Sequence, residues 1–193
     1  MPNHIKNRLE IIGDNFQVEI IRNFLKGKPF DDGSECLIDF NNIIPMPEDL
    51  HVDDMSNAPL DLEQKYKSNI EKYGYRTWYD WSIANWNTKW NAYSQELESY
   101  NVILFETAWS GVPKLISEIS SKFPDVKLYY EYSDEDTSYN CGYGTFQNGD
   151  DDLICLDGGS KESYELAFKL SPEIQEYYYF ENEINNYKYK DDE

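Results

Sequence analysis

Carboxylate side chains are crowded in the second half of the chain, at Glu131, Asp134, Glu135 and Asp136. Hard cations such as Mg²⁺ bind where several oxygen ligands converge, and a pair of carboxylates can supply acid–base chemistry when their separation is right. A second acidic run, residues 150–152, lacks the spacing of a calcium-binding EF-hand loop because its aspartates are consecutive. We therefore consider Glu131, Asp134 and Asp136 as ligands of a metal-dependent enzyme, against the alternative that they belong to solvated loops.

Tryptophan is concentrated between residues 75 and 93, where four of the five tryptophans lie. Trp86 and Trp90 are four residues apart and share one face if the stretch is helical. The segment is either an aromatic plug beneath a sheet or a ring-lined groove for a peptide or a flat ligand. The spacing predicts that Trp86 and Trp90 are mostly buried against the sheet, with Lys89 reaching solvent. The candidate binding residues of this segment are Trp78, Trp81, Trp86, Lys89 and Trp90.

A small basic patch is predicted near the start of the chain. Alternating apolar and polar residues over 5–12 predict a half-buried strand whose polar face carries His4, Lys6 and Arg8. We include His4 and Arg8 among the candidate binding residues, although a histidine in this setting is commonly an ordinary strand residue. The other histidine, His51, lies in a polar loop, so the two histidines give little indication of a metal site or a general base.

Sequence signatures of common enzymes are missing from the chain. There is no P-loop, no complete G-x-G-x-x-G motif and no serine or cysteine nucleophile elbow. The three cysteines, Cys36, Cys141 and Cys155, include no C-x-x-C pair, which argues against a disulfide framework, a zinc site and an iron–sulfur cluster. We expect no cofactor and, on balance, no enzymatic activity.

The composition indicates a folded and strongly acidic protein. Among the 193 residues are 17 Tyr, 9 Phe and 5 Trp, which supply enough large rings to build a core. The net charge of −20 disfavours direct binding of nucleic acid and favours a partner protein with a basic surface. No apolar run has transmembrane length and residues 1–8 carry no secretion signal, so we expect a cytoplasmic protein without membrane contact.

The hydrophobic pattern predicts an α+β fold in a single domain over residues 1–193. Strand, helix and strand follow one another twice, which favours a ferredoxin-like sandwich with a mostly antiparallel sheet and helices on one face. A tryptophan-rich helical insertion at about 60–95 separates the two halves, and an acidic extension begins at about residue 172. The predicted strands are 5–12, 36–40, 102–107, 126–132 and 153–156, and the predicted helices are 15–26, 62–73, 112–123 and 164–170.

Several segments resemble one known family. They are Met1-Pro2-Asn3-His4-Ile5-Lys6-Asn7-Arg8-Leu9, Phe40-Asn41-Asn42-Ile43-Ile44-Pro45-Met46-Pro47, Trp78-Tyr79-Asp80-Trp81, Asn85-Trp86-Asn87-Thr88-Lys89-Trp90-Asn91-Ala92, Phe105-Glu106-Thr107-Ala108-Trp109-Ser110, and Tyr132-Ser133-Asp134-Glu135-Asp136 with Asn140-Cys141-Gly142. Together they resemble the YubB-like ferredoxin-fold family of plasmid and phage proteins, which includes the Api-type phage proteins. The family pattern has glycine where Asn87 stands, and asparagine also tolerates a positive φ. The resemblance implies a ferredoxin-like fold, with no iron–sulfur cluster and no established activity.

Three functional hypotheses follow from these features. The first is an accessory protein of a mobile genetic element, in the cytoplasm of a bacterial host, that acts as a non-enzymatic protein-interaction module through the tryptophan segment. The second is an acidic nucleic-acid mimic that inhibits a host defence protein, which requires carboxylates in a row at phosphate-like spacing. The third is the metal-dependent enzyme that uses the carboxylates of residues 131–136, which requires at least two of them to converge in a pocket.

Overall fold

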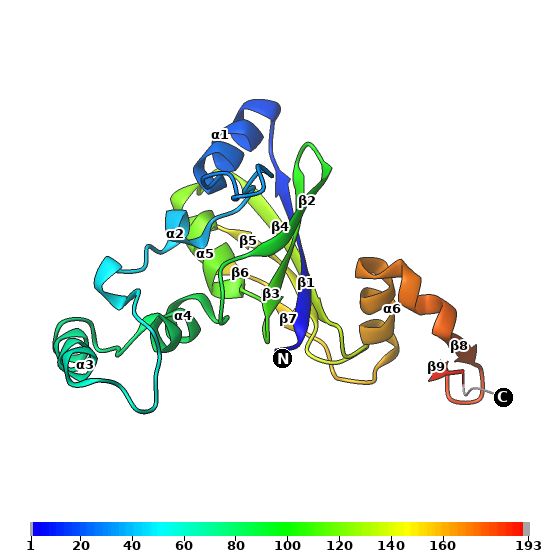
Figure 1. The fold of residues 1–193 in the computed structure, drawn as a ribbon. Helices are drawn as coiled ribbons and strands as arrows, with labels where there is room; N and C mark the ends of the chain where they lie inside the picture. The colour runs from blue at the N-terminus through cyan, green and yellow to red at the C-terminus, as the bar shows by residue number, and fades with distance from the viewer. Residues whose placement is uncertain (1, 191–193) are drawn as a thin grey trace.

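The structure is a computed structural model that describes residues 2–190. Its centre is an antiparallel sheet in the order β2-β3-β1-β4-β5-β6, with β7 paired to β5 (Figure 1). The inward side chains of β1, which are Ile5, Asn7, Leu9 and Ile11, are all buried, and this confirms the half-buried strand predicted from alternation. The strands of this sheet are β1 His4–Ile12, β2 Tyr93–Ser99, β3 Val102–Ala108, β4 Lys127–Asp134, β5 Gly142–Gln147, β6 Asp150–Asp151 and β7 Ile154–Cys155.

Four of these strands and two helices form a ferredoxin-like unit. Along the chain the order is β1, α1, β2, β3, α5 and β4, where α1 is Asn15–Leu25 and α5 is Pro113–Lys122. The sheet order β2-β3-β1-β4, with every neighbouring pair antiparallel, is that of a ferredoxin-like sandwich. The predicted fold class is therefore confirmed.

Both helices of this unit lie on the same face of the sheet (Figure 1). α1 begins with a capping box, because Asp14 and Gln17 each accept a hydrogen bond from the other's backbone N–H through their side-chain oxygens. Each of the two helices buries one apolar stripe at helical spacing. The buried residues are Val18, Ile21 and Leu25 on α1 and Leu115, Ile116 and Ile119 on α5.

The predicted strand over 36–40 is wrong, and the second strand of the unit is β2 instead. The backbone N–H groups of Leu37 and Ile38 donate to the side-chain oxygen of Gln95, at 2.7 and 2.9 Å. The backbone of this segment also bonds to the end of α1 and the residues after it, through Gly27 N–H to the Cys36 carbonyl and Asp39 N–H to the Leu25 carbonyl, so it pairs with no strand. Asp39 then caps a short helix, which ends the extended segment.

Residues 26–92 form a long insertion between α1 and β2. The helical insertion predicted over about 60–95 contains two of its helices, but it overruns into β2 at Tyr93 and lies inside the first half of the unit, not between the halves. β2 escapes prediction because it is a largely polar edge strand whose pairing with β3 is interrupted by register shifts. The helices of the insertion are α2 Phe40–Ile43, η1 Glu48–Leu50, α3 Leu60–Tyr73 and α4 Trp78–Trp86.

Beyond β4 the chain also covers the other face of the sheet, so the prediction of helices on one face holds for the ferredoxin-like unit and is wrong for α6. Helix α6 contacts β4 and β1 on the face opposite α1 and α5, and a hairpin stands away from the main sheet (Figure 1). Tyr164 and Phe168 of α6 pack against Tyr178 and Tyr187 of this hairpin. None of the helices within residues 2–190 combines the length and the apolar character needed to cross a membrane. The elements of this region are α6 Lys161–Leu170, η2 Pro172–Tyr177, β8 Tyr178–Glu181 and β9 Asn186–Tyr189.

One polar side chain in the core comes from the inward face of β1. Asn7 is 2% exposed, and its side-chain oxygen accepts a hydrogen bond from the Tyr130 hydroxyl at 2.5 Å. The Asn7 amide group donates to the carbonyl of Ile5 and to the hydroxyl of Thr107. The Tyr130 hydroxyl in turn accepts from the backbone N–H of Val112 at 2.7 Å. Each buried polar group in this network therefore has a partner.

Candidate functional site

Helix α4 carries the first three tryptophans of the predicted binding segment. It begins at the cap residue Thr77 and ends at Asn87, whose φ of 64° is left-handed. Asparagine tolerates this conformation better than most residues, so it can end a helix where glycine is more usual. Trp81 and Trp86 are buried on the inner face of the helix, and Trp78 is half-buried.

Trp86 is a core residue and therefore confirms the burial predicted from its spacing. It is 3% exposed, and its indole N–H donates to the carbonyl of Ile44 at 2.9 Å. Its ring meets Trp81 and Phe40 edge to face, with centroids 5.2 and 5.7 Å away. Trp81 and Trp86 thus serve as the aromatic plug, which was the structural alternative for this segment.

The prediction that Trp90 is mostly buried is wrong. Helix α4 ends before this residue, so Trp90 does not share a helical face with Trp86. Trp90 is 38% exposed. The turn that carries Trp90 is bonded to the end of β3. The hydroxyl of Thr88 donates to the carbonyl of Ala108 at 2.9 Å and accepts from the backbone N–H of Ala108 at 3.0 Å. The Asn87 amide also donates to the carbonyl of Gly111 at 2.9 Å. These bonds place Trp90 beside the residues that follow β3.

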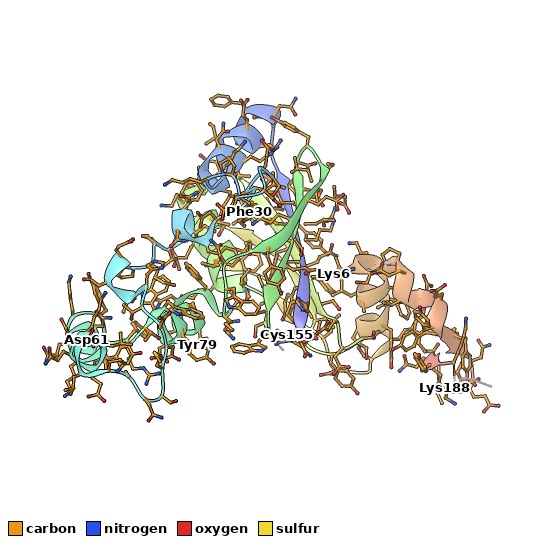
Figure 2. All side chains as sticks on the ribbon, viewed as in Figure 1. Lys6, Phe30, Asp61, Tyr79, Cys155 and Lys188 are labelled. Carbon is orange, nitrogen blue, oxygen red and sulfur yellow. The ribbon has the colours of Figure 1, made fainter. Side chains whose placement is uncertain are left out.

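The Lys89 cluster, which we define as Tyr79, Lys89, Trp90 and Trp109, is the exposed aromatic site of this region. The Lys89 ammonium lies 4.8 Å from the ring centroid of Trp90, 5.5 Å from that of Trp109 and 5.9 Å from that of Tyr79. Lys89 is half-buried over these rings, so only part of its side chain is open to solvent. Figure 2 labels Tyr79 on α4, between α3 and the sheet.

Two members of the cluster, Tyr79 and Trp109, were not among the residues predicted from the sequence. Trp109 directly follows β3, has a φ of 73° and donates its backbone N–H to the carbonyl of Asn3 at 2.9 Å. Its carbonyl accepts from the Asn140 amide at 2.9 Å. Trp109 is 37% exposed. No spacing in the sequence links it to Lys89, because the two meet only through the contact between the turn after α4 and the end of β3.

A polar groove adjoins the cluster on the face of the sheet that α6 contacts. The ring of Tyr93 contacts Trp90, and the Tyr93 hydroxyl lies 2.8 Å from Nδ1 of His4. Because this hydroxyl donates to the carbonyl of Thr107, it accepts from His4, which places the imidazole proton on Nδ1. Burial, with Glu106 nearby, raises the pKa of Tyr93 to about 12.

The groove itself has a volume of about 310 Å³ and is lined by both signs of charge. Lys6, on the side of the sheet that α6 faces in Figure 2, pairs with Glu173 at 2.8 Å and so ties the C-terminal extension to β1. His4 lies 3.8 Å from Glu106. His4 is thus a wall residue of the groove beside the Lys89 cluster, and the sequence-predicted basic patch is neutralised where it meets these glutamates.

Arg8 and Glu131, predicted respectively as a binding residue and a metal ligand, contact each other. Glu131 is 2% exposed; one of its oxygens accepts from Lys169 at 2.5 Å and the other from Arg8 at 3.4 Å. Arg8 also pairs with Glu10 and Glu98. The network joins β1, β2, β4 and α6, and its charged groups form ion pairs with one another.

The other predicted metal ligands do not join Glu131. Asp134 accepts hydrogen bonds from the amide groups of Asn3 and Asn140 and from the backbone N–H of Asp136, so it organises the turn after β4. Asp136 is exposed. In the part of the chain that the structure describes, no group of three His, Cys, Asp or Glu side chains is placed to hold a metal ion. Of Glu131, Asp134 and Asp136, Asp134 lines the groove of about 310 Å³, together with its neighbour Glu135.

Basic side chains are interleaved with the acidic surface. Paired cations occur on the insertion, the sheet and the C-terminal region. This arrangement gives no support to mimicry of nucleic acid, which requires an unbroken row of carboxylates. The basic residues in ion pairs with carboxylates are Lys6, Arg8, Lys26, Lys72, Arg76, Lys161, Lys169 and Lys188.

Comparison with known proteins agrees with the fold. Residues 85–171, somewhat less than half of the chain, match a family model described as the ferredoxin-like domain in Api92-like protein. This segment contains Lys89, Trp90 and Trp109. A crystal structure of the protein Api92 from Yersinia pseudotuberculosis aligns with 81% of this chain and 99% of that chain, at 11% identity and a TM-score of 0.44. No curated protein matches the chain.

Proposed function

We propose that this chain is a non-enzymatic protein-interaction module, that it serves a mobile genetic element in the cytoplasm of a bacterial host, and that it binds its partner through the Lys89 cluster. The observation that carries the proposal is the exposure of two neighbouring tryptophans, Trp90 at 38% and Trp109 at 37%. The mobile-element origin is supported only by the resemblance of the sequence to plasmid and phage proteins.

The composition of the cluster supports binding of a protein. Tryptophan and tyrosine are enriched among the residues that dominate binding energy at protein interfaces. The Lys89 cluster presents two tryptophans and one tyrosine side by side, and Trp78 extends it, because its ring lies 5.7 Å from that of Tyr79. The −20 net charge favours a partner with a basic surface.

The test is a comparison of immobilised variants in lysate from a bacterial host. The double variant Trp90→Ala, Trp109→Ala removes the exposed rings of the cluster. The matched control is Phe16→Ala, which removes a 69% exposed ring on α1 at the other end of the sheet. We expect a protein that is recovered by the wild type and by the control and is lost with the double variant, as quantified by mass spectrometry.

Recovery of the same proteins by all three chains would contradict the proposal. Circular dichroism and thermal melting of each variant establish that the fold is intact, which is expected because all three replaced side chains are more than one third exposed. A protein lost with both variants would indicate general stickiness of exposed rings and would also count against the Lys89 cluster as the site.

A further inference from the structure

The three rings of the Lys89 cluster surround a positive charge. The Lys89 ammonium lies within 5.9 Å of all three centroids, and a cation attracts the negative face of an aromatic ring at distances up to about 6 Å. Within residues 2–190, no carboxylate lies within 4.0 Å of this ammonium. The protein has 37 acidic side chains, yet the Lys89 ammonium lies against aromatic rings instead.

The backbone segments that carry the rings are fixed by contacts that do not involve the Lys89 ammonium, and the rings also contact other rings, Tyr79 against Trp109 and Trp90 against Tyr93. Tyr79 lies in the first turn of α4, which is capped by Thr77. The turn before Trp90 is fixed by Thr88, and the backbone of Trp109 is bonded on both sides, to Asn3 and Asn140. The cage therefore persists when the flexible lysine side chain swings out, and what it then offers is a vacant site for another cation.

We propose that Lys89 is the resident occupant of a cation site, and that the ammonium group of a partner's lysine displaces it. The proposal rests on the proposed function, since it assigns the chemistry by which the Lys89 cluster recognises its partner. The exchange replaces one cation–ring contact by another, so the cage alone favours neither side. The difference comes from the rest of a basic partner segment, which the −20 net charge attracts.

Because Lys89 already occupies the site, it affects which ligands can bind there. The apparent affinity of a ligand equals its affinity for the vacant site multiplied by the fraction of time for which the site is vacant. An isolated amine or a single lysine must compete with a tethered one and binds weakly. A basic segment that makes further contacts on the acidic surface overcomes this competition. Lys89 thus restricts the site to partners that present more than one point of contact.

The direct test uses choline and its uncharged isostere 3,3-dimethylbutan-1-ol, with tryptophan fluorescence as the readout. Lys89→Ala vacates the cage, and we expect its affinity for choline to be about ten-fold higher than that of the wild type. The uncharged isostere should bind neither chain, because the rings attract charge. Adding Trp109→Leu to Lys89→Ala should abolish choline binding. Failure of folded Lys89→Ala to bind choline, or equal binding of the isostere, would overturn the proposal.

A second measurement needs no variant. In the wild type, the ε-methylene protons of Lys89 should show upfield ring-current shifts by NMR, and saturating choline should move them back toward solvent values. Shifts that do not respond to bound choline would refute displacement. The outcome is separable from that of the proposed function: if choline fails but the tryptophan variants still lose the partner, the Lys89 cluster is an interface without a cation site.

Discussion

At the scale of single residues, the hydroxyl of Tyr130 joins two elements inside the core. It donates to Asn7 on β1 and accepts from the backbone of Val112 before α5. Burial raises the pKa of this phenol well above its ordinary value. Tyr130 therefore stays protonated throughout the physiological range and keeps its donor role.

Replacing Tyr130 by phenylalanine is expected to destabilise the fold by ~1–3 kcal/mol, because it leaves a buried acceptor and a buried donor without partners. Urea unfolding measures the loss. The matched control is Tyr132→Phe, because within residues 2–190 the Tyr132 hydroxyl has one hydrogen-bonding partner, the sulfur of Cys155, at 3.6 Å. This control should cost less than ~1 kcal/mol, since sulfur is a weak hydrogen-bonding group. Equal losses in the two variants would show that the Asn7 network adds nothing.

At the scale of elements, the end of α4 at Asn87 separates the two roles of the tryptophan segment. Trp86, before the end, packs into the core, whereas Trp90, after it, faces outward. Trp86→Ala is expected to cost ~3–5 kcal/mol of stability, and Trp90→Ala less than ~1.5 kcal/mol because its ring is partly exposed. Thermal melting compares the two directly. A larger loss for Trp90→Ala would mean that its ring supports the fold more than its exposure indicates.

Sequence patterns predict some elements of this structure and miss others. Period-two and helical spacing predict β1, α1 and α5 correctly, because each buries one regular face. They fail at residues 36–40 and at β2, where pairing depends on the side chain of Gln95 and on an irregular edge. At the site, Lys89 and Trp90 were predictable as residues of interest. Trp109 was not, because its proximity to them is a tertiary contact.

At the scale of the whole molecule, mutual repulsion among the acidic side chains opposes compactness. The net charge is −20, and the ion pairs at the surface are individually weak. Raising NaCl from about 10 to about 150 mM shortens the screening length from about 30 to about 8 Å. We expect the melting temperature to rise by about 2–4 °C, equivalent to ~1 kcal/mol. A fall in melting temperature with salt would show instead that the ion pairs outweigh the repulsion.

The insertion between α1 and β2 has a consequence for how the chain acquires its fold. β1 is one of the two inner strands of the ferredoxin-like unit, yet its hydrogen-bonded partners lie between 92 residues away (Glu10 to Val102) and 129 residues away (Ile5 to Asp134). At a synthesis rate of about 5–20 residues per second, β1 waits about 6–25 s on the ribosome before β4 is complete. One backbone edge of β1 has no partner until β3 is made, and the other has none until β4 is complete, so the newly made chain is open to chaperones, or to misassembly with other nascent chains, until the second half of the unit emerges.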